Sequence, residues 1–298
     1  MKFFLDHLNS GQGAKQTILV AKPSKRCIMI LYRRDCMEIT VLASGSKGNC
    51  TVLKTEAVTL LIDAGISYKR IKGHLATQGI ETTALDAVLL THEHIDHVKG
   101  LERVLQETPA TLYATSATFN HLHEKTTKVL NPERHQPVHS GLSFMLGNLI
   151  ITPVRVSHDA VDAIGFIIRE GDKTLVYMTD LGYLPAEDYP SIANADMYIF
   201  EANYDVSLLF SSARPHYLKR RIDSVRGHMS NTDSAYHMCH LIGPRTKTIV
   251  LAHPSEECNT ARHVLQTYRD VFRDYQRNLD DYDIIVAKQH EPISTVIL

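Results

Sequence analysis

The stretch of sequence that decides the fold is Thr91-His92-Glu93-His94-Ile95-Asp96-His97, in which four metal-ligand side chains stand within six residues. An apolar run over 87–90 precedes it and predicts a buried strand, and a helical pattern over 98–105 follows it. The stretch therefore predicts a turn from strand to helix at the carboxyl edge of a sheet, where open α/β sheets place their sites. Three imidazoles and a carboxylate this close together cost solvation and gain little packing unless a cation binds them. A solvated turn with incidental histidines is the alternative, and the tight spacing speaks against it.

The composition is that of a soluble globular protein, with 44% hydrophobic and 22% charged residues among 298. This length is sufficient for one large domain or two small ones. The five cysteines include no CxxC pair, so we expect neither a disulfide framework nor a thiolate zinc site, and a reducing cytoplasmic location fits best. No apolar run approaches the length of a membrane span, so no membrane partner is expected. The net charge of −1 neither indicates nor excludes a phosphate-rich partner.

The first 36 residues differ from the rest of the chain. They hold seven Lys or Arg and two Asp, a net charge of +5, and they include loop-like stretches. A regular strand pattern begins only at 38–43. We therefore expect a folded domain over 37–298. The extension over 1–36 is expected to be either disordered or the product of a mis-assigned translation start.

The remaining chain alternates β-rich and helical stretches. The expected strands lie near 38–43, 50–55, 58–62, 87–90, 112–114, 149–156, 165–169, 174–178, 197–200, 248–252, 282–287 and 293–298. The expected helices lie near 68–76, 98–105, 215–222, 231–241 and 260–274, with a polar helix after 114. Because each β-rich half is followed by helices, the pattern predicts an α/β (α+β) architecture with two sheets packed face to face and helices outside.

Four further polar residues share one placement, the end of an apolar strand. They are Asp63, His158, Asp180 and His253. Each alone is weak evidence, since a polar residue at a strand end usually marks only the start of a loop. Because all four repeat the placement of the histidine-rich stretch, together they predict a metal site at the sheet edges.

With this ordered set the chain resembles the metallo-β-lactamase-fold hydrolases over 37–298. The resemblance implies an αββα four-layer sandwich with two metal ions in a cleft at the sheet edges. It also implies that one ion is held by His92, His94 and His158, and the other by Asp96, His97 and His253, with Asp180 bridging the two. Asp63 is then the acid of the catalytic centre that orients the ligands. Glu93, between two ligands, receives no role.

The donor set predicts the metal and its chemistry. Neutral imidazoles suit borderline cations such as Zn²⁺, and carboxylates offset charge and can span two ions. We expect Zn²⁺, with Mn²⁺ or Fe²⁺ as alternatives. Two ions about 3.5–4 Å apart can bind one hydroxide between them and stabilise the charge on an attacked phosphoryl or carbonyl group.

Further segments resemble the YycJ (WalJ) family of these hydrolases. The turn over 44–49 resembles that family's SGSxGN motif, 227–231 its GHLSN motif and 251–259 its LxHLSxxN motif. The segment over 201–205 resembles the family's EANxD segment. YycJ proteins are described as 5′ to 3′ exonucleases on double-stranded DNA. The resemblance therefore implies a metal-dependent phosphodiesterase with DNA as its partner.

His228 resembles the non-ligand histidine of phosphodiesterase members, which stabilises the phosphorane or protonates the leaving oxygen. A hydrogen-bonded structural histidine is the alternative. Just before it, over 214–226, five basic residues fall within 13 positions, and this patch suits backbone phosphates as well as it suits a solvated helix face. The turn over 44–49 could offer backbone N–H groups to a phosphate, although a tight hairpin turn is its expected primary role. The expected substrate contacts are Ser46, Asn49, Lys219, Arg220, Arg221, Arg226, Ser230 and Asn231.

Two other functions stay open on this evidence. One is a small-molecule (cyclic) phosphodiesterase or another ester hydrolase on the same fold. The other is a non-catalytic DNA-repair or signalling scaffold in which the metals are only structural. Turnover of a plasmid-length duplex compared with turnover of a small chromogenic diester separates the exonuclease from the small-molecule enzyme. A scaffold would show stoichiometric metal without turnover of any nucleic acid.

Overall fold

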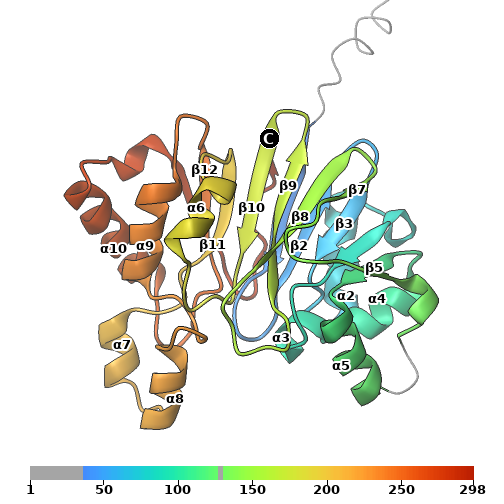
Figure 1. The fold of residues 1–298 in the computed structure, drawn as a ribbon, viewed down its shortest axis with the longest axis horizontal. Helices are drawn as coiled ribbons and strands as arrows, with labels where there is room; N and C mark the ends of the chain where they lie inside the picture. The colour runs from blue at the N-terminus through green and yellow to red at the C-terminus, as the bar shows by residue number, and fades with distance from the viewer. Residues whose placement is uncertain (1–35, 127–129) are drawn as a thin grey trace, which may run out of the picture. The chain divides into compact units, whose positions relative to one another are not determined.

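A computed structural model gives the fold and describes residues 36–126 and 130–298 (Figure 1). The described residues belong to one compact unit. The predicted extension over 1–36 lies, apart from Cys36, outside the described residues, and it stays a prediction. Within the described part of the chain, no helix has the length and apolar character that a membrane span requires.

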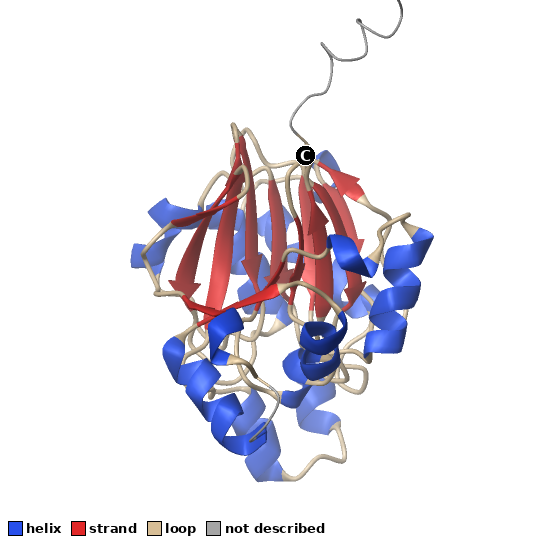
Figure 2. Ribbon diagram, turned by 90° about the vertical axis from the view of Figure 1, so that its right-hand side faces the viewer, coloured by secondary structure: helices blue, strands red, loops and turns tan. Residues whose placement is uncertain are grey.

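Two seven-stranded sheets form the centre of this unit (Figure 2). The first has the order β14-β1-β2-β3-β4-β5-β6, and the second has the order β13-β12-β11-β10-β9-β8-β7. The strands of the first sheet are β1 (Glu38–Ala43), β2 (Cys50–Lys54), β3 (Thr59–Ile62), β4 (Ala87–Leu89), β5 (Thr111–Ala114), β6 (His135–Pro137) and β14 (Val296–Ile297). Those of the second are β7 (Phe144–Leu146), β8 (Leu149–Arg155), β9 (Ile164–Glu170), β10 (Lys173–Met178), β11 (Met197–Glu201), β12 (Thr248–Ala252) and β13 (Asp283–Val286).

Each sheet contains a parallel run, β3 to β6 in the first and β10 to β13 in the second. The carboxyl ends of parallel strands meet at one edge of a sheet, so loops that follow these strands collect there. This is the edge at which the sequence places its polar strand ends.

Helices cover the outer faces of the two sheets (Figure 1). On the first sheet these are α2 (Tyr68–Thr77), α4 (Leu101–Glu107) and α5 (Ser116–Thr126), and on the second they are α6 (Tyr189–Ile192), α9 (Asn231–Leu241) and α10 (Ala261–Asp274). The short α3 (Ile95–Val98), α7 (Val206–Ser211) and α8 (His216–Ile222) lie below the sheets in Figure 1, and α7 and α8 share a small apolar cluster of their own. Short 3₁₀ helices occupy Thr82–Ala84, Pro132–Arg134, Ala186–Asp188 and Leu279–Asp281.

Strand β3 shows how alternation builds the layers. Leu60 and Ile62 face the core between the sheets, where Phe166 of the second sheet also packs. Leu61, between them, faces the outer core and packs with Ile71 of α2. Successive side chains of a strand point to opposite faces, and here both faces are buried. The predicted αββα sandwich is therefore confirmed.

The continuous helix predicted over 98–105 is instead two helices, α3 and α4, which are separated at Gly100. A Cβ at Gly100 would overlap the carbonyl oxygen of Ile66, and a Cβ at Gly65 would overlap that of Asp96. Both glycines thus permit a close backbone approach between the histidine-rich stretch and the loop after β3. This approach brings the first acidic strand end against the histidines.

Two short strands, β6 and β7, have no counterpart among the predicted elements, and the strand expected over 293–298 is only β14. The three residues of β6 include Pro137 and show no apolar alternation. They are extended because they pair with β5. Tertiary pairing, not local propensity, decides such segments.

Candidate metal centre

Three of the predicted site residues share an unusual backbone conformation. Asp63 follows β3, Asp180 follows β10 and His253 follows β12, and their φ angles are 61°, 56° and 54°. A side-chain-bearing residue in this left-handed region costs about 1–3 kcal/mol and persists only where the surroundings hold it. The chain therefore accepts backbone strain at the strand ends that converge on the site.

The first group of donors, here called the imidazole group, consists of His92, His94 and His158. One nitrogen from each ring lies within 4.8 Å of the other two. Nε2 of His158 lies 3.2 Å from Nδ1 of His94, and Nε2 of His92 is buried without a hydrogen-bond partner. Nδ1 of His158 donates to the carbonyl oxygen of Gly227 at 3.0 Å, which leaves Nε2 free to bind a metal. Burial lowers the pKa of His92 and of His158, so both rings stay neutral.

The second group, here called the carboxylate group, consists of Asp96, His97, Asp180 and His253. Nε2 of His97 lies 3.1 Å from Oδ2 of Asp180, and Nε2 of His253 lies 3.5 Å from Oδ2 of Asp96. Nε2 of His253 and Oδ2 of Asp180 are buried and make no hydrogen bond. The other oxygen of Asp180, Oδ1, lies 3.8 Å from Nε2 of His158. Asp180 thus lies between the two groups, as a bridging ligand requires.

The electrostatics of the carboxylate group call for positive charge. Burial alone would lower the pKa of His97 and His253, yet the carboxylates beside them, Asp180 foremost, raise it well above its usual value for His97 and to about 10 for His253. Burial alone would raise the pKa of Asp180, yet these same histidines hold it well below its ordinary value. Protons therefore compensate the buried carboxylates here, and a divalent cation can take their place. The donor types and the orphaned donor atoms fit a metal.

Asp63 orients the histidine-rich stretch. Its Oδ2 lies 2.8 Å from Nδ1 of His97, and its Oδ1 accepts from the backbone N–H of Thr91 at 2.9 Å. The hydroxyl of Thr91 lies 3.0 Å from both oxygens of Asp63. With Nδ1 held by Asp63, His97 presents Nε2 to the carboxylate group.

Glu201 is the principal residue that sequence reasoning missed, although its segment was noted. It is fully buried at the end of β11, and its Oε1 lies 2.8 Å from Nδ1 of His228 and 3.0 Å from Nδ1 of His253. Its Oε2 accepts from the backbone N–H of Leu181 at 2.6 Å. Burial alone would raise the pKa of Glu201, yet His228 and His253 lower it. One signal was available in the sequence, because Glu201 is an acid that ends an apolar strand.

His228 lies beside both groups. Its ring centroid is 5.3 Å from that of His158 and 5.1 Å from that of His253. Its side chain is 19% exposed, so a substrate can reach it. Because Nδ1 faces Glu201, Nε2 is the nitrogen available to a substrate.

A family model described as "Beta-lactamase superfamily domain" matches residues 59–253. The exodeoxyribonuclease WalJ of Streptococcus pneumoniae serotype 2 (strain D39) is 39% identical over 222 residues, which cover 74% of this chain and 82% of that protein. The exodeoxyribonuclease YycJ of Bacillus anthracis is 33% identical over 224 residues, which cover 75% and 84%. This chain belongs to the WalJ/YycJ family of the β-lactamase superfamily. The predicted family and the predicted class, a metal-dependent hydrolase, are confirmed.

Among solved structures, the metallo-β-lactamase-fold protein YhfI of Bacillus subtilis is similar to this chain with a TM-score of 0.66 and 19% identity. The likeness covers 87% of this chain and 99% of that one. At this identity the likeness speaks for the fold alone, and it agrees with the αββα sandwich found here.

The turn over 44–49 of this WalJ/YycJ member faces the metal centre with Asn49, while Ser46 is exposed. Asn49 is buried, and its Nδ2 lies 3.0 Å from Nε2 of His97 and 3.4 Å from Oδ2 of Asp96. Its Oδ1 accepts from the backbone N–H of Gly45 at 2.8 Å, which fixes the orientation of the amide. Asn49, predicted to contact the substrate, thus contacts two candidate metal ligands, Asp96 and His97.

Ser230 and Asn231 are also buried. The hydroxyl of Ser230 caps α9 by accepting from the N–H of Asp233 at 3.1 Å. The amides of Asn231 and Asn259 pair at 3.0 and 2.9 Å. These contacts give both residues a structural role beside His228, and their burial speaks against direct contact with a substrate.

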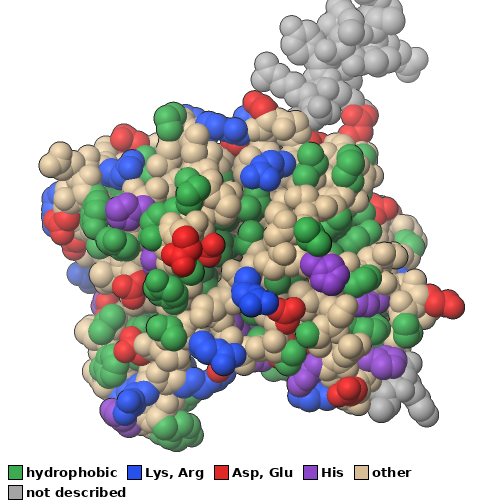
Figure 3. All heavy atoms as spheres, in the orientation of Figure 1, with side chains coloured by type: hydrophobic (Ala, Val, Ile, Leu, Met, Phe, Trp, Pro, Cys, Tyr) green, Lys and Arg blue, Asp and Glu red, His purple; other side chains and the backbone are tan. Residues whose placement is uncertain are grey.

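The predicted basic patch is largely engaged by internal contacts. Nζ of Lys219 donates to the carbonyl oxygens of Phe210 and Ser212 at the end of α7, at 2.7 Å each. Nε of Arg221 lies 2.6 Å from Oδ2 of Asp159, and Nε and Nη2 of Arg226 donate to the carbonyl oxygen of His158 at 3.2 Å. Figure 3 accordingly shows Lys and Arg side chains interspersed with acidic ones on the face it presents. Of the predicted patch, Arg220 is the exposed residue that is best suited to contact a phosphate.

Proposed function

We propose that this chain is a dinuclear-metal phosphodiesterase that degrades double-stranded DNA as a 5′ to 3′ exonuclease. The observation that carries the proposal is the arrangement of two donor groups around one shared carboxylate, Asp180, with His228 beside them. The relatives WalJ and YycJ are named exodeoxyribonucleases, which supports DNA as the substrate. A DNA substrate and free, buried cysteines agree with a cytoplasmic location.

The imidazole group would hold one divalent ion and the carboxylate group the other. Zn²⁺ suits these donors best, and Mn²⁺ or Fe²⁺ are the alternatives. When bound, such ions activate water at neutral pH and stabilise the charge on an attacked phosphoryl group.

The chain's own residues keep the donors in place. Asp63 holds Nδ1 of His97, and the carbonyl oxygen of Gly227 holds Nδ1 of His158, so each ring offers Nε2 to the centre. Partners of this kind typically contribute about 10- to 100-fold to metal affinity or activity. Ser46 and Arg220, both exposed, are the remaining candidates for contacts to DNA phosphates.

In this proposal His228 delivers a proton to the leaving oxygen. Its Nδ1 faces the buried carboxylate of Glu201 at 2.8 Å, which orients the ring. Burial would raise the pKa of Glu201, but the nearby His228 and His253 lower it more than burial raises it. Glu201 is therefore ionised at neutral pH. The pair therefore acts as an oriented acid beside the metal centre.

A small-molecule phosphodiesterase is the second candidate because a cavity of about 590 Å³ lies beside His158. This volume lies within the range of small-ligand pockets. The two functions differ in whether a polymer is required.

The test uses the metal-loaded protein and a linear duplex labelled at the 5′ end in one preparation and at the 3′ end in another. The proposed enzyme releases the 5′ label at once in short products and retains the 3′ label in fragments that shorten progressively. Early release of the 3′ label would show that digestion runs from 3′ to 5′ and would contradict the proposed direction. Turnover of a small chromogenic diester without turnover of DNA would favour the second candidate, and full metal content without any turnover would favour a scaffold.

A further inference from the structure

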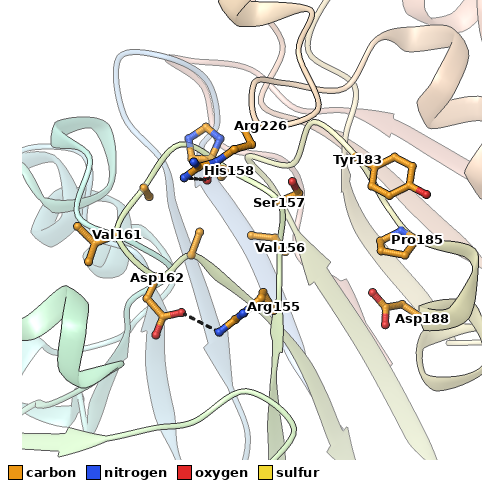
Figure 4. A pocket seen from close by; sticks show the side chains of 12 residues that line it. Arg155, Val156, Ser157, His158, Val161, Asp162, Tyr183, Pro185, Asp188 and Arg226 are labelled. Carbon is orange, nitrogen blue, oxygen red and sulfur yellow. Dashed lines mark hydrogen bonds and ion pairs between the residues drawn. The ribbon is translucent and has the colours of Figure 1, made fainter.

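A cavity of about 590 Å³ opens beside the metal centre (Figure 4). His158 forms part of its wall, so a group that occupies the cavity lies next to the imidazole group. In the close-up, Tyr183 and Pro185 stand on one side of the cavity and Val161 stands on the other. Two loops thus frame it, the one that carries His158 and the one that follows the shared carboxylate.

The ring of Tyr183 is presented by a firmly held loop. The backbone N–H of Leu181 donates to Oε2 of Glu201 at 2.6 Å, and that of Gly182 donates to the carbonyl oxygen of Ser157 at 2.9 Å. The side chain of Tyr183, the next residue, is 50% exposed. An aromatic ring that is half exposed on a fixed backbone offers a flat face at little cost in conformational entropy.

The charges that line the cavity largely cancel. Nη2 of Arg155 lies 3.7 Å from Oδ1 of Asp162, and Asp188 adds a carboxylate on the side of Tyr183. Arg226 directs Nε and Nη2 to the carbonyl oxygen of His158. A phosphate would require cations that are free to contact it. A neutral occupant has no such requirement.

The walls suit a flat, neutral, aromatic group. Val156, Ala160, Val161 and Pro185 line the cavity together with Tyr183. Every nucleobase has a π face that stacks on an aromatic side chain with little dependence on sequence. On the basis of the DNA substrate proposed above, we infer that this cavity binds the base of the nucleotide next to the scissile phosphate and that Tyr183 stacks on that base.

The inference has a consequence for how the enzyme meets its substrate. A base in this cavity has left the helical stack, which costs unpairing and unstacking energy. The cost is smallest at a duplex end, where a base has a stacked neighbour on one side only. The cavity therefore accounts for action from ends, with the metal centre next to the opened nucleotide.

The experiment compares two duplexes with the full-length, metal-loaded protein. One carries a normal nucleotide at the cleaved end, and the other carries an abasic tetrahydrofuran nucleotide at the same position. The proteins are the wild type, Tyr183→Ala, Tyr183→Phe and, as a control, Tyr275→Ala. Tyr275 is 42% exposed and follows α10.

For the wild type we expect the abasic end to lower kcat/KM by about 5- to 150-fold, the range that base–aromatic stacking covers. Tyr183→Ala should lose a similar factor on the normal duplex and almost nothing more on the abasic one. Tyr183→Phe should stay within about twofold of the wild type, because the ring is retained. The control should respond to the abasic end as the wild type does.

The inference is overturned if Tyr183→Ala and the abasic end lower kcat/KM independently of each other. If the factors for Tyr183→Ala and for the abasic end multiply, the base lies elsewhere. If the wild type cleaves both duplexes equally, the cavity holds no base, while the proposed exonuclease stands. If the wild type cleaves no DNA at all, the proposed function fails and this inference fails with it.

A binding measurement checks the contact without turnover. The metal-loaded His228→Ala protein is mixed with a duplex that carries 2-aminopurine at its end. Stacking on Tyr183 should quench the fluorescence of 2-aminopurine, and the added change Tyr183→Ala should restore it while Tyr183→Phe does not. Equal quenching with all three proteins would contradict the contact.

Discussion

The imidazole group and the carboxylate group both draw their donors from the strand ends of the two sheets and share one carboxylate, yet they differ in how they carry charge. In the imidazole group, burial lowers the pKa of His92 and His158, so these donors are neutral without a metal. In the carboxylate group, burial would lower the pKa values of His97 and His253, but the attraction of the neighbouring carboxylates raises them by more. In the first group, His92 and His158 therefore carry no charge that needs compensation. The second must hold either protons or a cation.

Asp180→Asn should give the largest effect, because Asp180 lies between both groups. We expect activity to fall below detection and metal content to fall from about two ions per chain to one or fewer. Elemental analysis of the purified variant, with circular dichroism as a check on folding, measures this. Two tightly bound ions in the variant would show that Asp180 is not shared.

His228→Ala should lower kcat by about 10²- to 10⁴-fold, the usual contribution of a general acid, with metal content unchanged. The matched variant is His253→Ala, because both rings contact Glu201 but only His253 belongs to the carboxylate group. That variant should lose metal as well as activity. Loss of metal from His228→Ala would place His228 among the ligands.

Asn49→Ala should weaken metal binding in the carboxylate group by about tenfold, because its Nδ2 contacts the donor atoms of Asp96 and His97. Arg226→Ala is the counterpart, because Arg226 supports the backbone of His158 in the imidazole group. Metal titration with a competing chelator resolves the two ions. If both variants weaken the same ion, the division into two groups is wrong.

The smallest expected effect is the number of protons that the protein releases when it binds metal. At pH 7, His253, with a pKa of about 10, and His97, with a raised pKa, carry protons in the metal-free protein. A metal ligand must be deprotonated, so metal binding releases these protons at pH 7 and releases fewer as the pH approaches 10. Calorimetry in two buffers of different ionisation enthalpy measures the release. Metal binding at pH 7 without proton release would contradict the assignment of charge.

Much of the fold follows from the sequence because its signals are local. The run over 87–90 is a buried strand by composition alone, and α9 begins at a capping Ser230. Asp63 follows β3 of the first sheet and Asp180 follows β10 of the second, so each lies at the edge where the parallel strands of its own sheet end, as their strand-end positions predict. Sequence order and strand polarity are sufficient for this prediction.

The rest depends on distant contacts. The role of Glu201 requires knowledge that His228 and His253 both reach it, although they stand 27 and 52 residues away. The basic residues of α8 look free in sequence, but Arg221 meets a carboxylate 62 residues distant. The positive φ of His253 is likewise imposed by its surroundings. Such facts follow from packing and not from local pattern.

The most direct test is a crystal structure of the metal-loaded protein with anomalous scattering recorded at the absorption edge of the metal. The imidazole group and the carboxylate group should each show one anomalous peak, with Asp180 in contact with both ions. A donor set of Asp180, Glu201, His228 and His253 also lies close enough to hold an ion. A peak bound by Glu201 and His228, in place of one in the carboxylate group, would contradict the account.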